Sequence, residues 1–202
     1  MTYVKFCGMR EQRDVDVACE LGVQAMGFVL WPRSPRFVDL ARVAAIVRSL
    51  PDSVTPVGVF VRPTEDEIDA ARDAGIRVAQ LHGVDTVQAA PPAALERWLA
   101  TSVDADLSAY GEGTVLLDAA DPERHGGTGR TIDWQKAAAM AQTRRVLLAG
   151  GLTTANVADA IRVVRPFGVD VASGIEQRPG VKDAHAMRTF VAAVRKADQW
   201  KN

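Results

Sequence analysis

The sequence predicts a (β/α)8 barrel that forms a single domain over residues 1–202. Short apolar segments, each followed by Gly, Pro or a polar residue, alternate with segments of helical periodicity along the chain. This alternation predicts a parallel sheet covered by helices, and eight repeats favour closure into a barrel over an open sheet. The length of 202 residues lies at the lower end of the range for this fold, so the barrel is expected to be compact.

Each predicted element is a short segment with the matching periodicity. The predicted strands are residues 4–7, 25–30, 57–61, 78–82, 97–103, 114–119, 146–149 and 169–172, and the predicted helices are residues 13–21, 40–50, 65–74, 134–141, 154–164 and 184–197. Thr153 or Thr154 is expected to cap the helix at 154–164, and Asp133 the helix at 134–141. Residues 83–113 fit least well, leaving room for only a short fourth helix before the fifth strand, with little more than a turn after it.

Composition excludes several classes of protein. The chain is 48% hydrophobic and 24% charged, its net charge is -1, and no basic stripe is present, so neither nucleic acid nor a membrane surface is expected as a partner. The first ten residues contain no apolar segment typical of a signal peptide, and no apolar run approaches the roughly 18 residues of a membrane span. Cys7 and Cys19 do not form a disulfide framework, so we expect free thiols in a cytoplasmic protein.

Several residues with chemical potential follow predicted strands. In a (β/α)8 barrel the carboxyl ends of the strands form the active face. Cys7, His82 and Asp118 each end an apolar segment, and the Pro-rich loop 31–36 follows another. The barrel would therefore bring these distant positions to one mouth.

Cys7 is a candidate base. Strand alternation places Lys5 and Cys7 on one face, and a lysine in the lumen beside the thiol would favour the thiolate, which can take a proton from carbon. A buried core cysteine is an equally good interpretation of position alone. Cys19 lies within a helical pattern, and there the structural interpretation is preferred.

Three other side chains have both functional and structural interpretations. A partly desolvated carboxyl at Asp118 would hold its proton as a general acid, although Asp also caps loops, and we favour the acid. His82 is more often a satisfied polar contact than a catalyst. The planar fork of Arg36 suits a carboxylate, but a solvated loop charge is the alternative.

Two glycine turns follow the last two predicted strands. Gly150 and Gly151 follow one strand, and Ser173 and Gly174 the next. Consecutive βα turns of this kind present backbone N–H groups that suit a phosphate, and the loops after strands seven and eight are the usual phosphate site of this fold. A further glycine loop, at 125–129, either folds over a ligand or simply leads to Asp133.

The motifs KFCG, GFVLWPRSPR, VGVFV, QLHG, LLD, GGTGRTIDW, LAGGL and VDVASGIEQRPGVKD occur in this order over nearly the whole chain. In this combination the sequence resembles the phosphoribosylanthranilate isomerase family of tryptophan biosynthesis. The resemblance implies a TIM barrel that converts phosphoribosyl anthranilate into the carboxyphenylamino-deoxyribulose phosphate by an Amadori rearrangement. It implies a small phosphosugar as the partner, with no metal and no organic cofactor. We expect a monomer or a weak homodimer.

The resemblance also implies roles for individual residues. Cys7 would be the general base and Asp118 the general acid, while Arg36 would contact the anthranilate carboxylate. The implied substrate-binding residues are Arg36, His82, Asp170, Gly127, Gly150, Gly151, Ser173 and Gly174, of which Asp170 lies near the sugar hydroxyls and the last four bind phosphate.

One segment departs from the family, and other functions stay open. The family's fifth strand ends in a lysine-containing KAF-type segment, whereas this chain has ERWLATSV, with a reduced helix before it.

Another phosphosugar isomerase on the same barrel, or a synthase of the indole-glycerol-phosphate type, is the second hypothesis, but such a synthase needs more lysines and glutamates at strand ends. A non-catalytic phosphosugar-binding barrel is the third.

Overall fold

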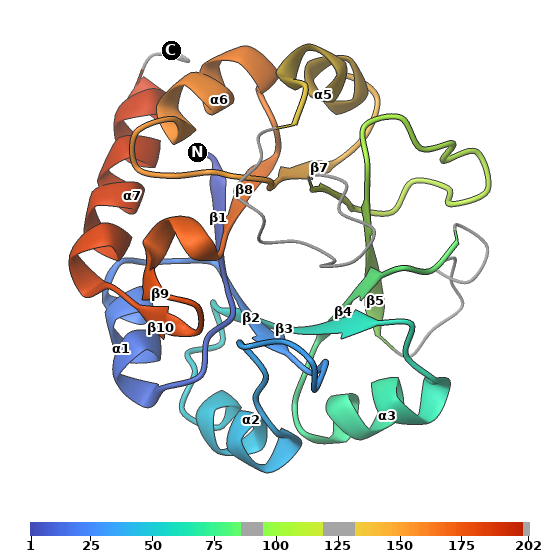
Figure 1. Cartoon of the computed structure of the whole chain (residues 1–202), viewed down its shortest axis with the longest axis vertical. Coiled ribbons are helices and arrows are strands. Elements are labelled where there is room, and N and C mark those ends of the chain that lie inside the picture. The colour runs from blue at the N-terminus through green and yellow to red at the C-terminus, as the bar shows by residue number, and fades with distance from the viewer. Residues whose placement is uncertain (86–94, 119–131, 200–202) are drawn as a thin grey trace.

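Eight parallel strands close into a barrel in the order of the sequence (Figure 1). This computed structural model describes residues 1–85, 95–118 and 132–199. The strands are β1 Tyr3–Cys7, β2 Ala25–Val29, β3 Thr55–Val61, β4 Val78–His82, β5 Glu96–Thr101, β6 Val115–Leu117, β7 Val146–Leu148 and β8 Gly168–Val171. The predicted fold class is confirmed, and the strands lie close to their predicted positions.

The helices pack around the outside of the barrel (Figure 1). They are α1 Gln12–Glu20, α2 Leu40–Val47, α3 Glu65–Asp73, α5 Trp134–Ala141, α6 Val157–Val164 and α7 Ala184–Asp198. The short fourth helix predicted before β5 falls largely outside the described residues. No helix in the described ranges has both the length and the apolar character needed to span a bilayer.

Helix starts follow the expected capping chemistry at one site and differ at another. Asp133 caps α5 as predicted, because its carboxylate accepts hydrogen bonds from the first-turn backbone. Thr153 makes a capping contact before the next helix, since its hydroxyl accepts a hydrogen bond of 3.3 Å from the Ala155 backbone, but the helix itself starts later than predicted. Helix α6 begins later, with Asn156 at the N-cap position, and the Asn156 side chain instead accepts a hydrogen bond of 2.8 Å from the Thr153 backbone. The Thr153 carbonyl also accepts a hydrogen bond of 3.1 Å from the Val157 backbone, so residues 153–156 form a turn that leads directly into α6.

Side chains of the barrel sort onto two faces, as strand alternation requires. The outward-facing apolar residues pack against the helices and form the main core. The inward-facing residues fill the lumen with a lower layer, which includes Trp98 and Leu116, and an upper layer formed by Cys7, Val29 and Val59. The lumen is therefore packed below the mouth, and the upper layer already contains the candidate base.

The connection after β5 is a loop with turns, as predicted, and Tyr110 holds it in place. The Tyr110 hydroxyl donates a hydrogen bond of 2.7 Å to the Arg97 carbonyl and accepts one of 3.1 Å from the Leu99 backbone. Burial of the phenol raises the pKa of Tyr110 to about 12. With the following loop fixed to it by Tyr110, the divergent ERWLATSV segment still forms the barrel strand β5.

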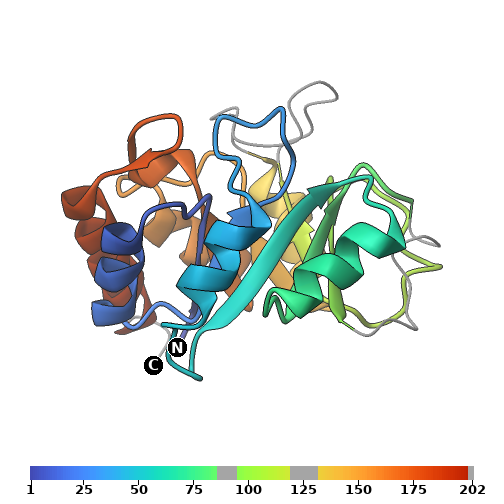
Figure 2. The same ribbon diagram turned by 90° about the horizontal axis from the view of Figure 1, so that it is seen from below.

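The 3-10 turn η1 Ser173–Ile175 and a small hairpin after β8 were not predicted. The hairpin strands are β9 Glu176–Arg178 and β10 Val181–Lys182, which pair antiparallel. Pro179 and Gly180 form its turn, and Gly180 has a φ of 80°, so this Pro-Gly dipeptide was a usable sequence signal. Figure 2 shows the hairpin and the loop after β2 rising at the end of the barrel away from the N-terminus.

Candidate active site at the barrel mouth

Three predicted site residues lie at one end of the barrel because all strands run parallel. Cys7 and His82 are the last residues of β1 and β4, and Asp118 directly follows β6. Leu116 belongs to the lumen layer, so alternation turns Asp118 toward the same interior two residues later. The backbone N–H of Asp118 donates to the Thr101 carbonyl at 3.1 Å, which continues the sheet to this residue.

A buried ion pair lies directly beneath Cys7. Lys5 is completely buried, and its Nζ lies 2.7 Å from Oδ1 of Asp170. The register of neighbouring strands β1 and β8 pairs these two residues. A β-carbon at Gly27, opposite Cys7 on β2, would lie 3.0 Å from both the Cys7 sulfur and Lys5 Nζ. Only glycine therefore leaves room for the thiol and the ammonium to occupy the same part of the lumen.

Lys5 does favour the thiolate, as expected, but it does not lower the pKa of Cys7 overall. Burial raises the pKa of the Cys7 thiol above its ordinary value, and the opposing influence of Lys5, Lys182 and Arg36 does not cancel it. Burial also tends to lower the pKa of Lys5, but contacts with Asp170 and Cys7 outweigh it and the pKa is raised. The lysine is a permanent cation already paired with Asp170, so only part of its field acts on the sulfur.

Replacing Lys5 by methionine is expected to raise the pKa of Cys7 further. The change removes a cation that stabilises the thiolate and leaves the Asp170 carboxylate, which disfavours it. The rate of alkylation of Cys7 by iodoacetamide should therefore fall at a fixed pH near 8, and its pH profile should move upward. Measurement in a Cys19→Ala background isolates the signal, and Arg188→Met on the outer face of α7 is the control. An unchanged profile would contradict the effect.

The side chain of Arg36 is fixed by an ion pair and is not a solvent-exposed loop charge. Its Nε donates to Oε1 of Glu176 at 2.9 Å and its Nη2 to Oε2 at 2.8 Å, and the two side chains are 13% and 3% exposed. Its aliphatic part packs on Gly8, where φ is 77° and an added β-carbon would lie 2.7 Å from Arg36 Cδ. The glycine after Cys7 thus lets the arginine approach the end of β1.

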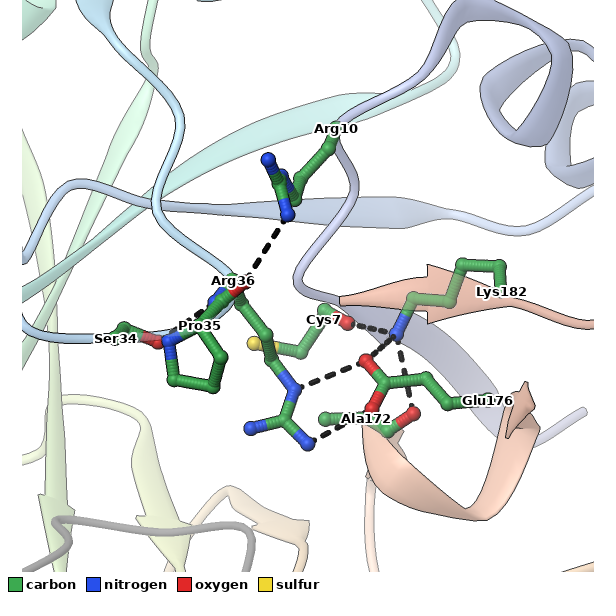
Figure 3. A network of polar contacts seen from close by, with 8 residues as sticks. All are labelled: Cys7, Arg10, Ser34, Pro35, Arg36, Ala172, Glu176 and Lys182. Atoms are coloured by element: carbon green, nitrogen blue, oxygen red, sulfur yellow. Dashed lines mark hydrogen bonds and ion pairs between the residues drawn. The ribbon is translucent and has the colours of Figure 1, made fainter. Parts of the chain in front are cut away.

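Glu176 and Lys182 are site residues that the sequence interpretation missed. Lys182 Nζ is buried and donates to the Cys7 carbonyl at 2.6 Å, the Ala172 carbonyl at 3.1 Å and Oε1 of Glu176 at 3.0 Å. Figure 3 shows these contacts converging beside Arg36. Charged residues in a Pro-Gly loop ordinarily indicate solvent exposure, and only their place within the family motif SGIEQRPGVKD set them apart.

His82 faces the lumen as a buried residue. Its Nε2 lies 2.8 Å from Nε2 of Gln80, the inward-facing residue two positions earlier on β4. Gln80 Oε1 is buried and has no hydrogen-bond partner among the residues that the structure describes. The pair is a polar element in the wall of the barrel, consistent with either a binding or a structural role.

The tandem glycine turns meet, as the phosphate-site interpretation requires. Gly150 and Gly151 have φ angles of 75° and 69°, in the left-handed region that favours glycine. Gly174, in the 3-10 turn after β8, packs so closely that a β-carbon there would collide with the Leu152 carbonyl oxygen. Ser173 lies beside it in the same turn. Gly127 lies outside the described residues.

Within the described parts of the chain, no group of three His, Cys, Asp or Glu side chains is placed to hold a metal ion. Cys7 and Cys19 are both free thiols.

Comparison with known proteins identifies a family. The family described as N-(5'phosphoribosyl)anthranilate (PRA) isomerase matches residues 4–193. N-(5'-phosphoribosyl)anthranilate isomerase of Pelobacter propionicus is 41% identical over 197 residues, which are 95% of this chain and 94% of that protein.

Solved structures agree with this match. Monomers of a dimeric phosphoribosylanthranilate isomerase from Thermotoga maritima superpose with a TM-score of 0.80 at 31% identity, covering 97% of this chain and 100% of that one. A phosphoribosyl anthranilate isomerase in complex with reduced 1-(o-carboxyphenylamino)-1-deoxyribulose 5-phosphate superposes with a TM-score of 0.81, with the same identity and coverage.

Proposed function

Because this chain belongs to the N-(5'-phosphoribosyl)anthranilate isomerase family, we propose that it catalyses the Amadori rearrangement of phosphoribosyl anthranilate in tryptophan biosynthesis. The product is 1-(2-carboxyphenylamino)-1-deoxyribulose 5-phosphate. The observation that carries the proposal is the convergence of Cys7, Arg36 and Asp118 on one barrel mouth. These groups supply a base, a carboxylate anchor and an acid, which are the functions the reaction needs.

The first step in the proposal is acid-catalysed ring opening by Asp118. The protonated carboxyl donates its proton to the ring oxygen of the ribose, and the bond between that oxygen and the first carbon breaks. The lone pair of the anilino nitrogen forms the double bond of a protonated Schiff base. A positioned acid of this kind contributes about 10²–10⁴-fold to rate. The buried strand β6 holds Asp118 at the mouth for this role.

The second step is proton abstraction by Cys7. The Schiff base acidifies the proton on the second carbon, and the thiolate removes it. The electron pair of that C–H bond forms the carbon–carbon double bond of an enolamine, which neutralises the nitrogen. Tautomerisation then moves the enol proton to the first carbon and leaves a ketone. Cys7 releases its proton to solvent and Asp118 takes one up, so substrate and enzyme both balance and the enzyme returns to its starting form. The cationic intermediate adds a positive charge near the sulfur, which favours the thiolate that burial disfavours in the free protein.

Anchors at the two ends of the substrate hold the reacting carbons between acid and base. The turns at Gly150, Gly151, Ser173 and Gly174 are the proposed phosphate site, and Gly127 is proposed to contribute from the loop after β6. Arg36 is the proposed anchor of the anthranilate carboxylate, and Asp170 that of the sugar hydroxyls, with His82 in the same wall. Fixing both ends supplies the orientation on which intramolecular rate depends.

Loss of anthranilate fluorescence tests the proposed function. Wild-type protein given phosphoribosyl anthranilate should remove the emission of the substrate as product forms. An alternative phosphosugar isomerase would leave the emission constant and turn over another phosphosugar. A non-catalytic barrel would bind the reduced product analogue without any turnover.

Replacing Arg36 by methionine is expected mainly to raise KM, by about tenfold or more, because charge-assisted contacts are worth about 1.5–3 kcal/mol. The lost contact lies on a part of the substrate remote from the bonds that change. Steady-state kinetics on the variant measure the separation of KM from kcat. An effect confined to kcat would contradict the anchor role.

The proposal extends to the state of the protein in the cell. One acid and one base suffice for every step, so we propose that the reaction uses neither a metal nor an organic cofactor. We also propose a cytoplasmic protein, one catalytic domain over residues 1–202, that is a monomer or a weak homodimer. Light scattering over a range of concentrations tests the last point.

A further inference from the structure

We propose that Glu176 is a positioning residue that orients the carboxylate-binding arginine and, through Lys182, also holds the strand end that carries Cys7. The inference rests on the proposed function, because it assigns Glu176 a part in recognising the anthranilate carboxylate. Glu176 belongs to the β9–β10 hairpin, and its two carboxylate oxygens accept hydrogen bonds from Arg36 and Lys182. It acts through two cations, and each connection is visible in Figure 3.

The first connection selects which edge of Arg36 faces a ligand. A guanidinium has two edges able to receive a carboxylate in bidentate fashion, one formed by Nε and Nη2 and the other by Nη1 and Nη2. Glu176 occupies the first edge, at 2.9 Å from Nε and 2.8 Å from Nη2. Figure 3 shows Nη1 directed away from Glu176. A second carboxylate is therefore received at the remaining edge, in one fixed plane.

The second connection ties Glu176 to Cys7. Oε1 of Glu176 accepts from Lys182 Nζ as well as from Arg36, and the same ammonium donates to the carbonyls of Cys7 and Ala172. These carbonyls lie at the ends of neighbouring strands β1 and β8. One carboxylate thus connects the anchor for the substrate ring to the backbone of the base.

The charges explain why a carboxylate is needed at this position. Arg36 and Lys182 are both largely buried, and each cation disfavours the other, as the effect of Arg36 on the pKa of Lys182 indicates. Glu176 lies between them and offsets one of the two charges. The remaining positive charge suits one further anion, which is the ring carboxylate of the proposed substrate.

The test measures binding of two ligands that differ in this carboxylate. Reduced 1-(o-carboxyphenylamino)-1-deoxyribulose 5-phosphate carries it, and the reduced 1-phenylamino analogue of that compound lacks only the carboxylate and keeps the ring, the phosphate and the sugar hydroxyls. Glu176→Gln should weaken inhibition by the first ligand by about tenfold or more and leave inhibition by the second within about twofold. Glu20→Gln, which removes an exposed partner of Arg188, is the matched control and should change neither.

A double-variant cycle identifies the route of the effect. In an Arg36→Met background, Glu176→Gln should produce little additional loss of affinity for the carboxylate-bearing ligand, because the group it orients is already gone. Additive losses would overturn the proposal. Equal weakening of both ligands by Glu176→Gln would also overturn it, since that is the result of a merely structural role.

A second variant keeps the proposal testable if Glu176→Gln does not fold. Glu176→Asp keeps the buried negative charge but withdraws the oxygens from Arg36 by one methylene. It should show the same selective loss for the carboxylate-bearing ligand, and unchanged selectivity would overturn the proposal. If the wild type neither binds the reduced analogue nor consumes phosphoribosyl anthranilate, the proposed function fails. If it does both and Glu176 variants show no selective loss, this inference alone fails.

Discussion

Replacing Cys7 by alanine is expected to lower kcat by about 10²–10⁴-fold, the usual contribution of a positioned base. The thiolate is the group proposed to take the proton from the second carbon of the sugar. Cys7 lies in the upper lumen layer with Val29 and Val59, facing the mouth. Steady-state loss of anthranilate fluorescence measures the effect directly.

The structure provides good controls for this variant. Lys182 contacts the backbone carbonyl of Cys7 and not its sulfur, so alanine keeps the contact that holds the strand end. The variant should therefore keep its affinity for the reduced product analogue and a thermal unfolding midpoint close to that of the wild type. Cys19→Ala is the matched control, because this thiol lies on α1 away from the lumen. Turnover near wild type in Cys7→Ala would remove the thiol from the mechanism.

The kcat/KM of the wild-type protein should depend on pH through the thiol of Cys7 and the carboxyl of Asp118. A carboxyl ordinarily titrates near 4 and a thiol near 8.5, and burial moves the pKa of Cys7 still higher. The thiolate that the reaction needs is then the minor form of Cys7 at neutral pH. The wild-type profile should be a bell, because the reaction needs Cys7 as thiolate and Asp118 as carboxylic acid, and the two apparent values belong to the pair.

Local pattern was sufficient to predict the barrel, because strand and helix periodicity are properties of short segments. Apolar runs such as residues 78–82 and 146–149 became β4 and β7, and Asp133 capped α5 as expected. The start of α6 was not predictable in this way. Thr153 makes a capping contact, yet α6 begins only at Val157, and no pattern in the sequence shows that a separate turn comes first.

The candidate site was predictable where a residue ends a strand and not where side chains meet across the fold. The positions of Cys7, His82 and Asp118 follow from the barrel alone. The contact of Arg36 with Glu176 joins residues 140 positions apart, and that of Lys182 with the Cys7 carbonyl joins residues 175 apart, so no local pattern encodes either. The pKa of Cys7 was misjudged for a related reason, since proximity to Lys5 is visible in the strand pattern but the extent of burial is not.

Replacing Asp118 by asparagine is expected to lower kcat by about 10²–10⁴-fold, because the amide keeps the shape of the carboxyl but has no proton to donate as an acid. The change leaves the backbone contact between Asp118 and Thr101 in place, so β6 should keep its register. Affinity for the reduced product analogue should change little. A loss of binding as large as the loss of kcat would indicate an anchor and not an acid.

The pH dependence of Asp118→Asn separates the two titrating groups. With the carboxyl removed, the remaining rate depends on the thiolate alone and should rise with pH through the pKa of Cys7 before it levels off. In Cys7→Ala the remaining rate depends on the protonated carboxyl and should fall as pH rises through the pKa of Asp118. Measuring kcat/KM from about pH 3 to 10 in both variants tests the assignment, and a bell that persists in either variant would show that another residue titrates in its place.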